Sequence, residues 1–236
     1  MLCKIADLYT EIPEAGDLFP RCKEYICEEE GSADIIIRTE LFRDNLSKQV
    51  LSHNDYVYVE SGAQFYTQLL KFKGLLLHSS AVEYEGKAYL FSGFSGDGKS
   101  THTRLWQTVF GTKARVFNDD KPALRLVDGR WLAYGTPWCG KDAININMCV
   151  PVAAICFMKQ AHENRIRRLS NQESVQMIIA QTTRRFNRTV GLDLMISHVD
   201  NLVRRIPVFE LENRPEPEAA YLSYETMSRA AEEMGL

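Results

Sequence analysis

The stretch LLLHSSAVEYEGKAYLFSGFSGDGKSTHTRLW, residues 75–106, decides how this chain folds. Two runs rich in β-forming residues, 75–85 and 87–93, flank a turn at Glu85-Gly86, which is the pattern of an antiparallel hairpin. The second run leads directly into the glycine-rich loop GFSGDGKS, and residues 99–111 then follow a helical pattern. Strand, glycine turn and helix form the context in which a G-x-x-x-x-G-K-[ST] motif predicts phosphate binding.

Phosphate requires hydrogen-bond donors at close range with no side chain in the way. The three loop glycines let the backbone present its N–H groups, and the helix that follows adds its positive N-terminal end. Lys99 supplies a cation for the β- and γ-phosphates, and Ser100, assisted by Thr101, supplies a hydroxyl to Mg²⁺. We therefore predict ATP and Mg²⁺ as cofactors, and a nucleotide site made of Gly93, Ser95, Gly96, Asp97, Gly98, Lys99, Ser100 and Thr101.

A pair of acids follows the next predicted strand. The segment 114–120, ARVFNDD, ends in Asp119 and Asp120. Crossover connections return the next strand beside the first, so these acids are expected next to the phosphate loop. One can hold Mg²⁺ while the other takes a proton from an incoming hydroxyl. The alternative is that NDDKP (118–122) is only a solvated turn.

Other segments carry two interpretations each. His78 precedes the hairpin and is either structural or catalytic, and periodicity does not decide between these. In YGTPWCGK (134–141), Trp138 is a candidate for stacking and Lys141 for contacting phosphate, although a packed loop with a solvated lysine explains the segment equally well. Two arginine groups fit solvated helix ends or contacts to phosphate or an acidic peptide. They are Arg165, Arg167, Arg168 and Arg184, Arg185, Arg188.

The whole chain is predicted to be α/β, with a small N-terminal α+β lobe over residues 1–72 and a catalytic domain over 73–236. In the lobe we expect a hairpin within 24–39, a helix-like segment at 40–51, a strand at 55–61 and a helix over 63–74 capped by Gly74. The later part predicts alternating strands and helices. These are a hairpin at 121–135, strands at 151–160 and 207–213, and helices at 170–186, 192–206 and 216–234.

Composition limits the classes of partner. A net charge of −3 gives no general reason to expect nucleic acid or an anionic membrane. The first residues lack the pattern of a signal peptide, and no apolar run is long enough to span a membrane. The six cysteines have no metal-binding spacing and are expected to be reduced thiols, which predicts a cytoplasmic protein.

A family resemblance follows from these residues. LHSSAVEYEGKAYLFSGFSGDGKST (77–101) resembles the start of the catalytic domain of HPr kinase/phosphorylase and its shorter relatives, which share the phosphoenolpyruvate carboxykinase-type nucleotide fold. The similarity continues through NDDKPALR, GTPWCGK, PVAAICFMKQ and IPVFELENRPEPEAA, about residues 70–225. These later segments look like the short HPr-kinase-like proteins of peptide-modification gene clusters. The resemblance implies a mixed sheet whose P-loop is fed by an antiparallel hairpin.

The resemblance also implies roles for particular residues. Lys99 would bind nucleotide phosphates, Ser100 and Asp119 would hold Mg²⁺, Asp120 would be the base, and His78 would lie close to the reacting phosphate. Thr101 stands where HPr kinases carry an acid, and their C-terminal signature has no match here, so neither phosphorolysis nor HPr as substrate is implied.

We thus expect an ATP- and Mg²⁺-dependent kinase that phosphorylates a Ser or Thr hydroxyl of a peptide or protein, a ribosomally made precursor peptide being one candidate. The alternatives are a nucleotide-binding accessory module without chemistry, and a small-molecule hydroxyl kinase or ATPase on the same fold. The sequence does not decide between a monomer and a homo-oligomer.

Overall fold

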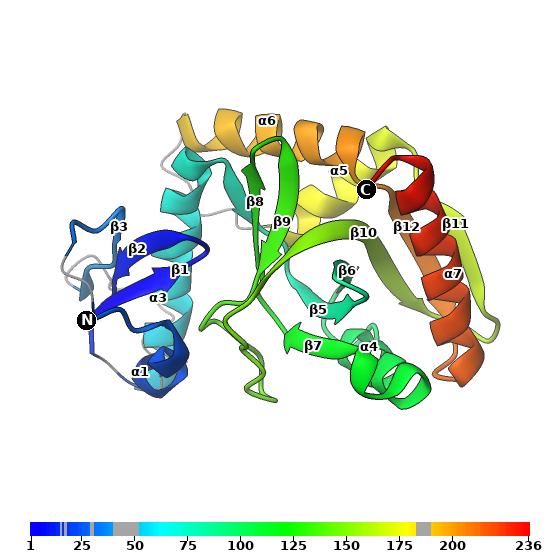
Figure 1. The fold of residues 1–236 in the computed structure, drawn as a ribbon, viewed down its shortest axis with the longest axis horizontal. Coiled ribbons are helices and arrows are strands. Elements are labelled where there is room, and N and C mark those ends of the chain that lie inside the picture. Colours follow the sequence, from blue (N-terminus) through cyan, green and yellow to red (C-terminus); the bar gives the residue numbers. More distant parts are fainter. Residues whose placement is uncertain (15, 17, 29–30, 40–51, 183–189) are drawn as a thin grey trace.

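The computed structural model describes residues 1–236 except 15, 17, 29–30, 40–51 and 183–189. Strands and helices alternate along most of the described chain (Figure 1). The strands are β1 (Leu2–Ile5), β2 (Leu8–Glu11), β3 (Ile35–Ile36), β4 (Gly74–Leu76), β5 (Ser79–Tyr84), β6 (Lys87–Ser92), β7 (Arg115–Asn118), β8 (Ala123–Val127), β9 (Arg130–Tyr134), β10 (Cys149–Gln160), β11 (Arg165–Arg168) and β12 (Val208–Asn213).

The α-helices are α1 (Leu18–Arg21), α3 (His53–Leu69), α4 (Lys99–Phe110), α5 (Asn171–Gln181), α6 (Val190–Arg205) and α7 (Pro217–Glu233). The short 3₁₀ turns η1 (Lys23–Tyr25), η3 (Leu70–Phe72) and η4 (Gly111–Lys113) also lie in the described part of the chain.

The main sheet is mixed, as the sequence predicted. Its strand order is β4-β8-β9-β10-β6-β5-β7, and β12 pairs with the outer part of β10 and with β11. β10 runs parallel to β6 and to β12, whereas β5 is antiparallel to β6 and to β7. The predicted hairpin β5–β6 and the hairpin β8–β9 are both present, each with a left-handed residue followed by glycine in its turn.

The crossover through α4 differs from the prediction in one respect. We expected the strand that ends before the acidic pair to lie directly beside β6, but β5 lies between them, because the hairpin partner already occupies that edge of β6. Since β5 is antiparallel to both neighbours, β6 and β7 still point the same way. Their carboxyl ends therefore share one edge of the sheet.

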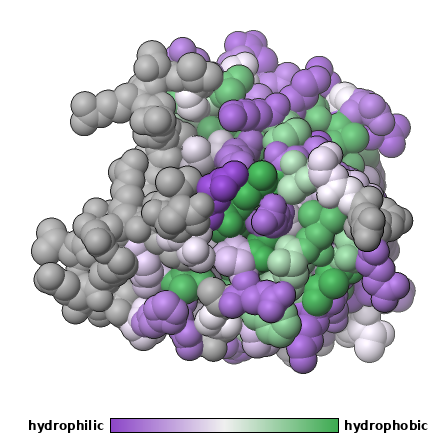
Figure 2. Space-filling view, turned by 90° about the vertical axis from the view of Figure 1, so that its left-hand side faces the viewer, coloured by the Kyte–Doolittle hydropathy of each residue, from purple (hydrophilic) through white to green (hydrophobic). Residues whose placement is uncertain are grey.

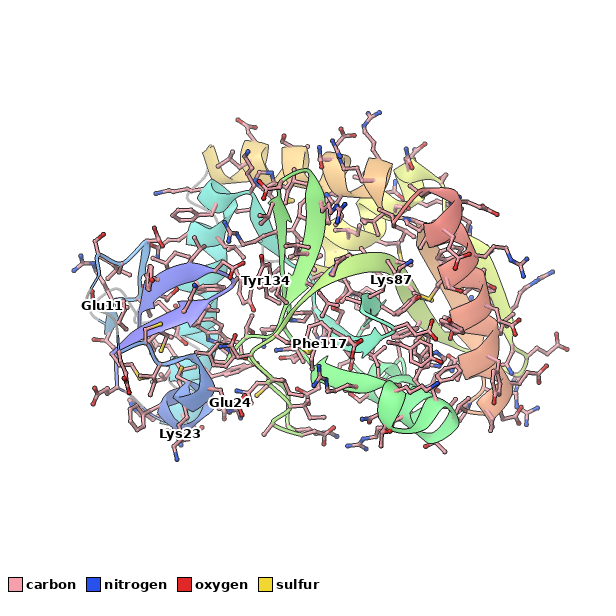
Figure 3. All side chains as sticks on the ribbon, viewed as in Figure 1. Glu11, Lys23, Glu24, Lys87, Phe117 and Tyr134 are labelled. Carbon is pink, nitrogen blue, oxygen red and sulfur yellow. The ribbon has the colours of Figure 1, made fainter. Side chains whose placement is uncertain are left out.

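Three clusters of buried side chains fill the molecule. One lies between the sheet and helices α5 and α6, and includes Phe117, Phe157 and Val199. A second lies on the side covered by α4 and α7, which are joined by a hydrogen bond of 3.0 Å from the Trp106 indole to the Ser223 hydroxyl. Phe117 on β7 lies in the interior, as Figure 3 shows.

The third cluster joins the N-terminal segment to the main sheet. A small sheet of β1, β2 and β3 packs with α3 onto β4, β8 and β9, where Tyr134 is buried (Figures 1 and 3). On this side of the molecule hydrophobic residues form small groups between hydrophilic ones (Figure 2). The division into a lobe over 1–72 and a domain over 73–236 stays a prediction, since the two parts share this cluster.

The N-terminal predictions were partly wrong. The strand expected at 55–61 is part of α3, because Ser52 caps the helix by accepting the Asp55 N–H and the apolar face packs into the third cluster. The hairpin expected within 24–39 is absent from the described residues there, since residues 23–25 form a 3₁₀ turn and β3 pairs in parallel with β2. Lys73, not Gly74, takes the left-handed position after α3 and η3. The helix-like segment at 40–51 lies outside the described residues.

The later predicted elements are present, whereas β11 (Arg165–Arg168) was not predicted. The Ser170–Glu173 capping box opens α5, and Gly111 ends α4. The predicted helix over 170–186 is seen up to Gln181, and residues 183–189 are not among those described. In the part of the chain that is described, no helix combines the length and hydropathy needed to cross a bilayer.

The buried His102 predicts acid sensitivity. Burial within the second cluster lowers the pKa of His102 to about 3, from an ordinary value of 6.5, and its Nε2 accepts a hydrogen bond from the Trp106 indole. As the pH falls, His102 therefore binds a proton near pH 6.5 in the unfolded chain but only near pH 3 in the native chain. We expect the free energy of unfolding to be highest above pH 6.5 and to fall below it, by up to about 5 kcal/mol at pH 3.

Urea unfolding at pH 7, 5 and 4 checks this expectation. His102→Gln should flatten the pH dependence, whereas His162→Gln, which changes an exposed histidine after β10, should leave it unchanged. If the free energy of unfolding fell equally with pH in the wild type and in His102→Gln, the expectation would be contradicted.

Candidate functional site

The site residues gather at one edge of the main sheet. β6 ends at this edge and continues into the glycine loop, β7 ends there and continues into Asp119-Asp120, and β5 begins there directly after His78. The strand order β6-β5-β7 thus places the loop, the histidine and the acids side by side. The carboxyl ends of sheet strands are where α/β proteins bind their ligands.

The glycine loop has the backbone that phosphate binding needs. Gly96 and Gly98 have φ of 96° and 95°, a region that other residues enter only with strain. Gly98 is the N-cap of α4 and has no side chain, so the first N–H groups of the helix donate no side-chain capping bond to it. Gln160, at the end of β10, donates to the Gly96 carbonyl at 2.6 Å and fixes the loop to the sheet.

Lys99 and Asp97 both turn toward the loop itself. The buried Lys99 ammonium donates to the carbonyls of Gly93 and Phe94, each at 2.9 Å. Burial lowers the pKa of Lys99, and the charges of Asp120 and Asp97 act in the opposite direction. The Asp97 carboxylate accepts the Phe94 N–H at 2.6 Å, so this side chain braces the loop.

The remaining loop residues predicted for nucleotide binding differ in exposure. Ser95 and Thr101 are exposed, whereas Ser100 is half-buried at the start of α4. Ser95 lies before the start of α4, and Thr101 lies in its first turn.

Asp120 is the centre of a hydrogen-bond network. Its Oδ1 lies 3.0 Å from His78 Nε2. Its Oδ2 accepts from the Tyr58 hydroxyl at 2.8 Å and lies 2.5 Å from the Lys121 ammonium. Burial alone would raise the pKa of this carboxyl, but the His78 hydrogen bond and the Lys121 charge hold the pKa well below its usual range. Asp120 is therefore ionised at neutral pH.

His78 is fixed from two sides. The His78 N–H donates to the Gln181 carbonyl at 2.8 Å, and its Nδ1 lies 3.0 Å from the Gln181 side-chain oxygen. Gln181 ends α5 and is buried. The imidazole ring is thus held between two oxygens, with Nδ1 against the Gln181 side chain and Nε2 against the Asp120 carboxylate.

Asp119 occupies a different environment from its neighbour. Its carboxylate accepts the N–H of Gly140 at 2.6 Å and that of Asp142 at 3.2 Å, and the side chain is buried. Burial raises the pKa of Asp119 above the usual range, although the two backbone hydrogen bonds act against this. A Cβ at Gly140 would lie 2.9 Å from Asp119 Oδ2, so a larger residue here would require the carboxylate to shift.

The segment 134–141 divides between the two interpretations. Trp138 is fully buried, stacks on Phe65 at 4.6 Å between ring centroids and donates to the Ser61 hydroxyl, so it is a packing residue. Lys141 is exposed and lines a pocket beside Asp120. Among the arginines, Arg167 forms ion pairs with Glu173 and Glu210 at the surface, as the solvated interpretation expects. Arg184, Arg185 and Arg188 lie outside the described residues.

Sequence reasoning missed Tyr58, Lys121 and Gln181. Lys121 directly follows the acidic pair in the sequence, and this position could have identified it as a partner of Asp120. Tyr58 was hidden by the wrong strand prediction, and the Ser52-x-x-Asp55 start of a helix was the signal that would have found it. Gln181 lies 103 residues from His78 and carries no local signal.

The residues present fit a nucleoside triphosphate with Mg²⁺. The loop offers left-handed glycines, an uncapped helix start and a buried cation. Among the described residues, no three His, Cys, Asp or Glu side chains gather as a metal cluster. Mg²⁺ does not need one, because it usually binds one or two protein oxygens together with phosphate and water.

The chain was compared with curated proteins, with solved structures and with family models. No curated protein matches its sequence. One similar solved structure is "Structure of the Hpr(Ser) kinase/phosphatase from Coxiella burnetii", at 12% sequence identity and a TM-score of 0.36, over 66% of this chain and 88% of that one. A likeness at this TM-score does not establish a shared fold.

The family model of the SynChlorMet cassette protein ScmC matches residues 55–214, more than half of the chain. The match begins in α3, just before Tyr58, and ends just after β12, so it includes the glycine loop, His78 and the acidic pair. The chain belongs to the family of the SynChlorMet cassette protein ScmC.

Proposed function

We propose that this protein is a kinase that transfers the γ-phosphoryl group of ATP to a Ser or Thr hydroxyl of a peptide or protein. The observation that carries the proposal is the alignment of the glycine loop, His78 and Asp120 along one sheet edge, with Asp120 ionised. The family description, a cassette protein, agrees with a place in a gene cluster.

The phosphate side is formed by the loop and α4. The backbone N–H groups around Gly96 and Gly98 would hold the phosphates, and Lys99 would move from the two loop carbonyls to the transferred group. Ser100 and Asp119 would hold Mg²⁺, which when bound neutralises charge on the phosphate oxygens. Asp119 suits this role, because two backbone N–H groups fix its carboxylate.

The acceptor side is formed by Asp120 and Tyr58. Tyr58 has one proton but two acceptors, Asp120 Oδ2 at 2.8 Å and the Cys139 carbonyl at 3.0 Å. When the Tyr58 proton points to Cys139, a lone pair on Asp120 is free for the acceptor hydroxyl. Burial, followed by the Asp120 charge, raises the pKa of Tyr58 far above its usual range, so Tyr58 stays a neutral donor.

At phosphorus, the reaction forms one P–O bond and breaks one. The acceptor oxygen bonds to the γ-phosphorus, the bond from that phosphorus to the β,γ-bridging oxygen breaks, and ADP leaves. The hydroxyl proton passes to Asp120 and then to solvent. A carboxylate with a lowered pKa is a weak base, which suits a loose transition state in which orientation of the hydroxyl contributes more than early proton removal.

A nucleotide-binding module without chemistry is the less favoured alternative. Such a module needs the loop but has no need for an ionised carboxylate held by three side chains. A small-molecule kinase on the same fold would use the same residues, and the nature of the acceptor separates the two.

Incubation with labelled ATP, Mg²⁺ and a library of Ser/Thr peptides tests the proposal. We expect label on serine or threonine, located by mass spectrometry, with one ADP formed for each phosphate transferred, and no transfer when EDTA removes Mg²⁺. Absence of labelled peptide together with ATP hydrolysis that no peptide stimulates would contradict a peptide kinase.

A further inference from the structure

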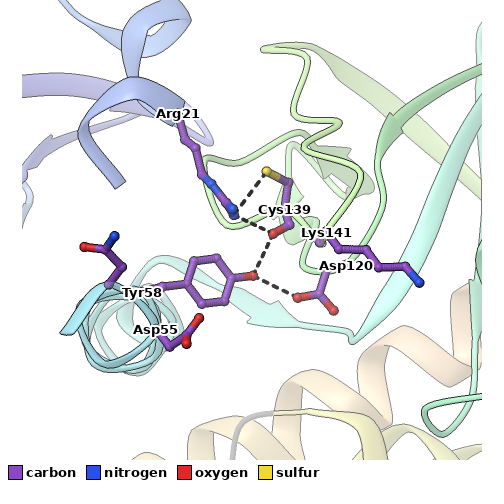
Figure 4. Close-up of a pocket in the computed structure, with 8 residues that line it drawn as sticks. Arg21, Asp55, Tyr58, Asp120, Cys139 and Lys141 are labelled. Carbon is purple, nitrogen blue, oxygen red and sulfur yellow. Dashed lines mark hydrogen bonds between the residues drawn. The ribbon is translucent and has the colours of Figure 1, made fainter. Parts of the chain in front are cut away.

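A pocket of about 300 Å³ opens beside Asp120 (Figure 4). Arg21 at the end of α1, Asp55 and Tyr58 on α3, and the loop 139–141 line it together with Asp120. The described residues of the glycine loop do not contribute to its wall. The pocket therefore reaches the reacting carboxylate from the N-terminal segment, separately from the phosphate side.

The pocket is lined by two acids and two cations, and neither cation forms an ion pair with a described residue. Of its two acids, Asp120 is paired with Lys121, and Asp55 accepts the Ser52 hydroxyl at 2.7 Å. Of its two cations, Arg21 binds only neutral partners within the described part of the chain, the Cys139 carbonyl at 2.8 Å and the Cys139 sulfur at 3.5 Å. Lys141 is exposed, and the described residues provide it with no ion pair.

A chain of hydrogen bonds links Arg21 to Asp120. Arg21 and the Tyr58 hydroxyl bind the same Cys139 carbonyl, and that hydroxyl also reaches Asp120 (Figure 4). The Arg21 guanidinium also lies over the Tyr58 ring, 5.2 Å from its centroid. A carboxylate bound by Arg21 would thus be separated from a hydroxyl on Asp120 by the Cys139 carbonyl and the Tyr58 hydroxyl. Three successive contacts of 2.8, 3.0 and 2.8 Å join Arg21 to Asp120. Residues one or two apart in an extended peptide span about 3–7 Å, a length of the same order.

We propose that this pocket selects the acceptor, and that it takes a peptide with Asp or Glu within two positions of the phosphorylated Ser or Thr. Arg21 and Lys141 bind that carboxylate, and guanidinium suits it because of its paired donors. The inference rests on the proposed function, which makes the bound peptide the acceptor of the phosphoryl group. It adds the chemical class of the peptide and assigns its recognition to Arg21 in the N-terminal segment and to Lys141 in the loop 139–141.

Binding without nucleotide tests this proposal independently of catalysis. The probes are two fluorescein-labelled peptides of equal length with one serine, flanked at two positions on each side by Glu in one and by Gln in the other. Fluorescence anisotropy should show the Glu peptide binding about tenfold more tightly at low salt, with the difference shrinking as salt rises.

Matched variants assign the effect to the pocket. Arg21→Gln and Lys141→Gln should each remove most of the difference between the peptides, and Arg21→Lys should restore part of it. Arg130→Gln removes an exposed arginine that begins β9 and does not line the pocket, and it should change neither affinity. If Arg21→Gln unfolds the protein, Lys141→Gln, which changes an exposed side chain, still decides the question.

Equal affinities for the two peptides, no binding of either, or a preference that survives both Gln variants would overturn the proposal. Failure of the proposed function is a separate result, namely acid-selective binding at this pocket without transfer of phosphate. Transfer without any acid preference would keep the kinase and reject the pocket.

Discussion

Lys99→Ala is expected to lower phosphoryl transfer by about 10²–10³-fold while leaving the fold intact. Lys99 is the buried cation of the loop, and its ammonium is held by the carbonyls of Gly93 and Phe94 rather than by an acid. Neutral partners release it readily to a phosphate, and because burial lowers its pKa, the site favours the arrival of an anion. Removing the charge leaves the backbone N–H groups alone to stabilise the transferred group.

The measurement is the initial rate of phosphate transfer from ATP, together with ATP affinity. Lys113→Ala, which removes an exposed lysine just after α4, is the matched control and should retain the wild-type rate. Thermal unfolding of both variants shows whether the fold is kept. A Lys99→Ala protein that transfers phosphate within tenfold of wild type would show that this lysine does not serve the reaction.

The sequence predicted the part of the site that is local in the chain. The hairpin, the glycine loop and α4 follow from residues 75–111, because turn glycines, β-rich runs and a helical pattern act over short distances. The acidic pair also follows a strand, as expected. The insertion of β5 between β6 and β7 was missed, since strand order depends on which edge the hairpin partner occupies and not on any local pattern.

The acceptor side was not predictable in the same way. Tyr58 reaches Asp120 only because α3 packs beside the main sheet, and its β-branched neighbours Val57 and Val59 favour a strand when propensity alone is read. Gln181 and Arg21 come from distant parts of the chain, 103 residues from His78 and 118 residues from Cys139. Such contacts are decided by tertiary packing, which periodicity does not encode.

Asp120→Asn is expected to lower transfer by about 10²-fold or more, the usual effect of losing a positioned acid–base group. The substitution keeps the shape of the side chain but removes the charge that His78 and Lys121 face, and it places an amide donor against existing donors. Asp128→Asn, in the exposed β8–β9 turn, is the matched control.

The same variant should also change how the stability of the fold depends on pH. Because the pKa of Asp120 is lower in the folded chain than the ordinary 3.8, its charge stabilises the fold above pH 3.8, and this contribution is lost as pH falls below that value. Asp120→Asn should therefore unfold more easily at pH 7, and its stability should fall less than that of wild type between pH 5 and 3. Full transfer by Asp120→Asn would remove Asp120 from the mechanism. An unchanged acid profile would mean that His78 and Lys121 do not hold the carboxylate in its charged form, and the network at this sheet edge would then have no electrostatic part in orienting the acceptor.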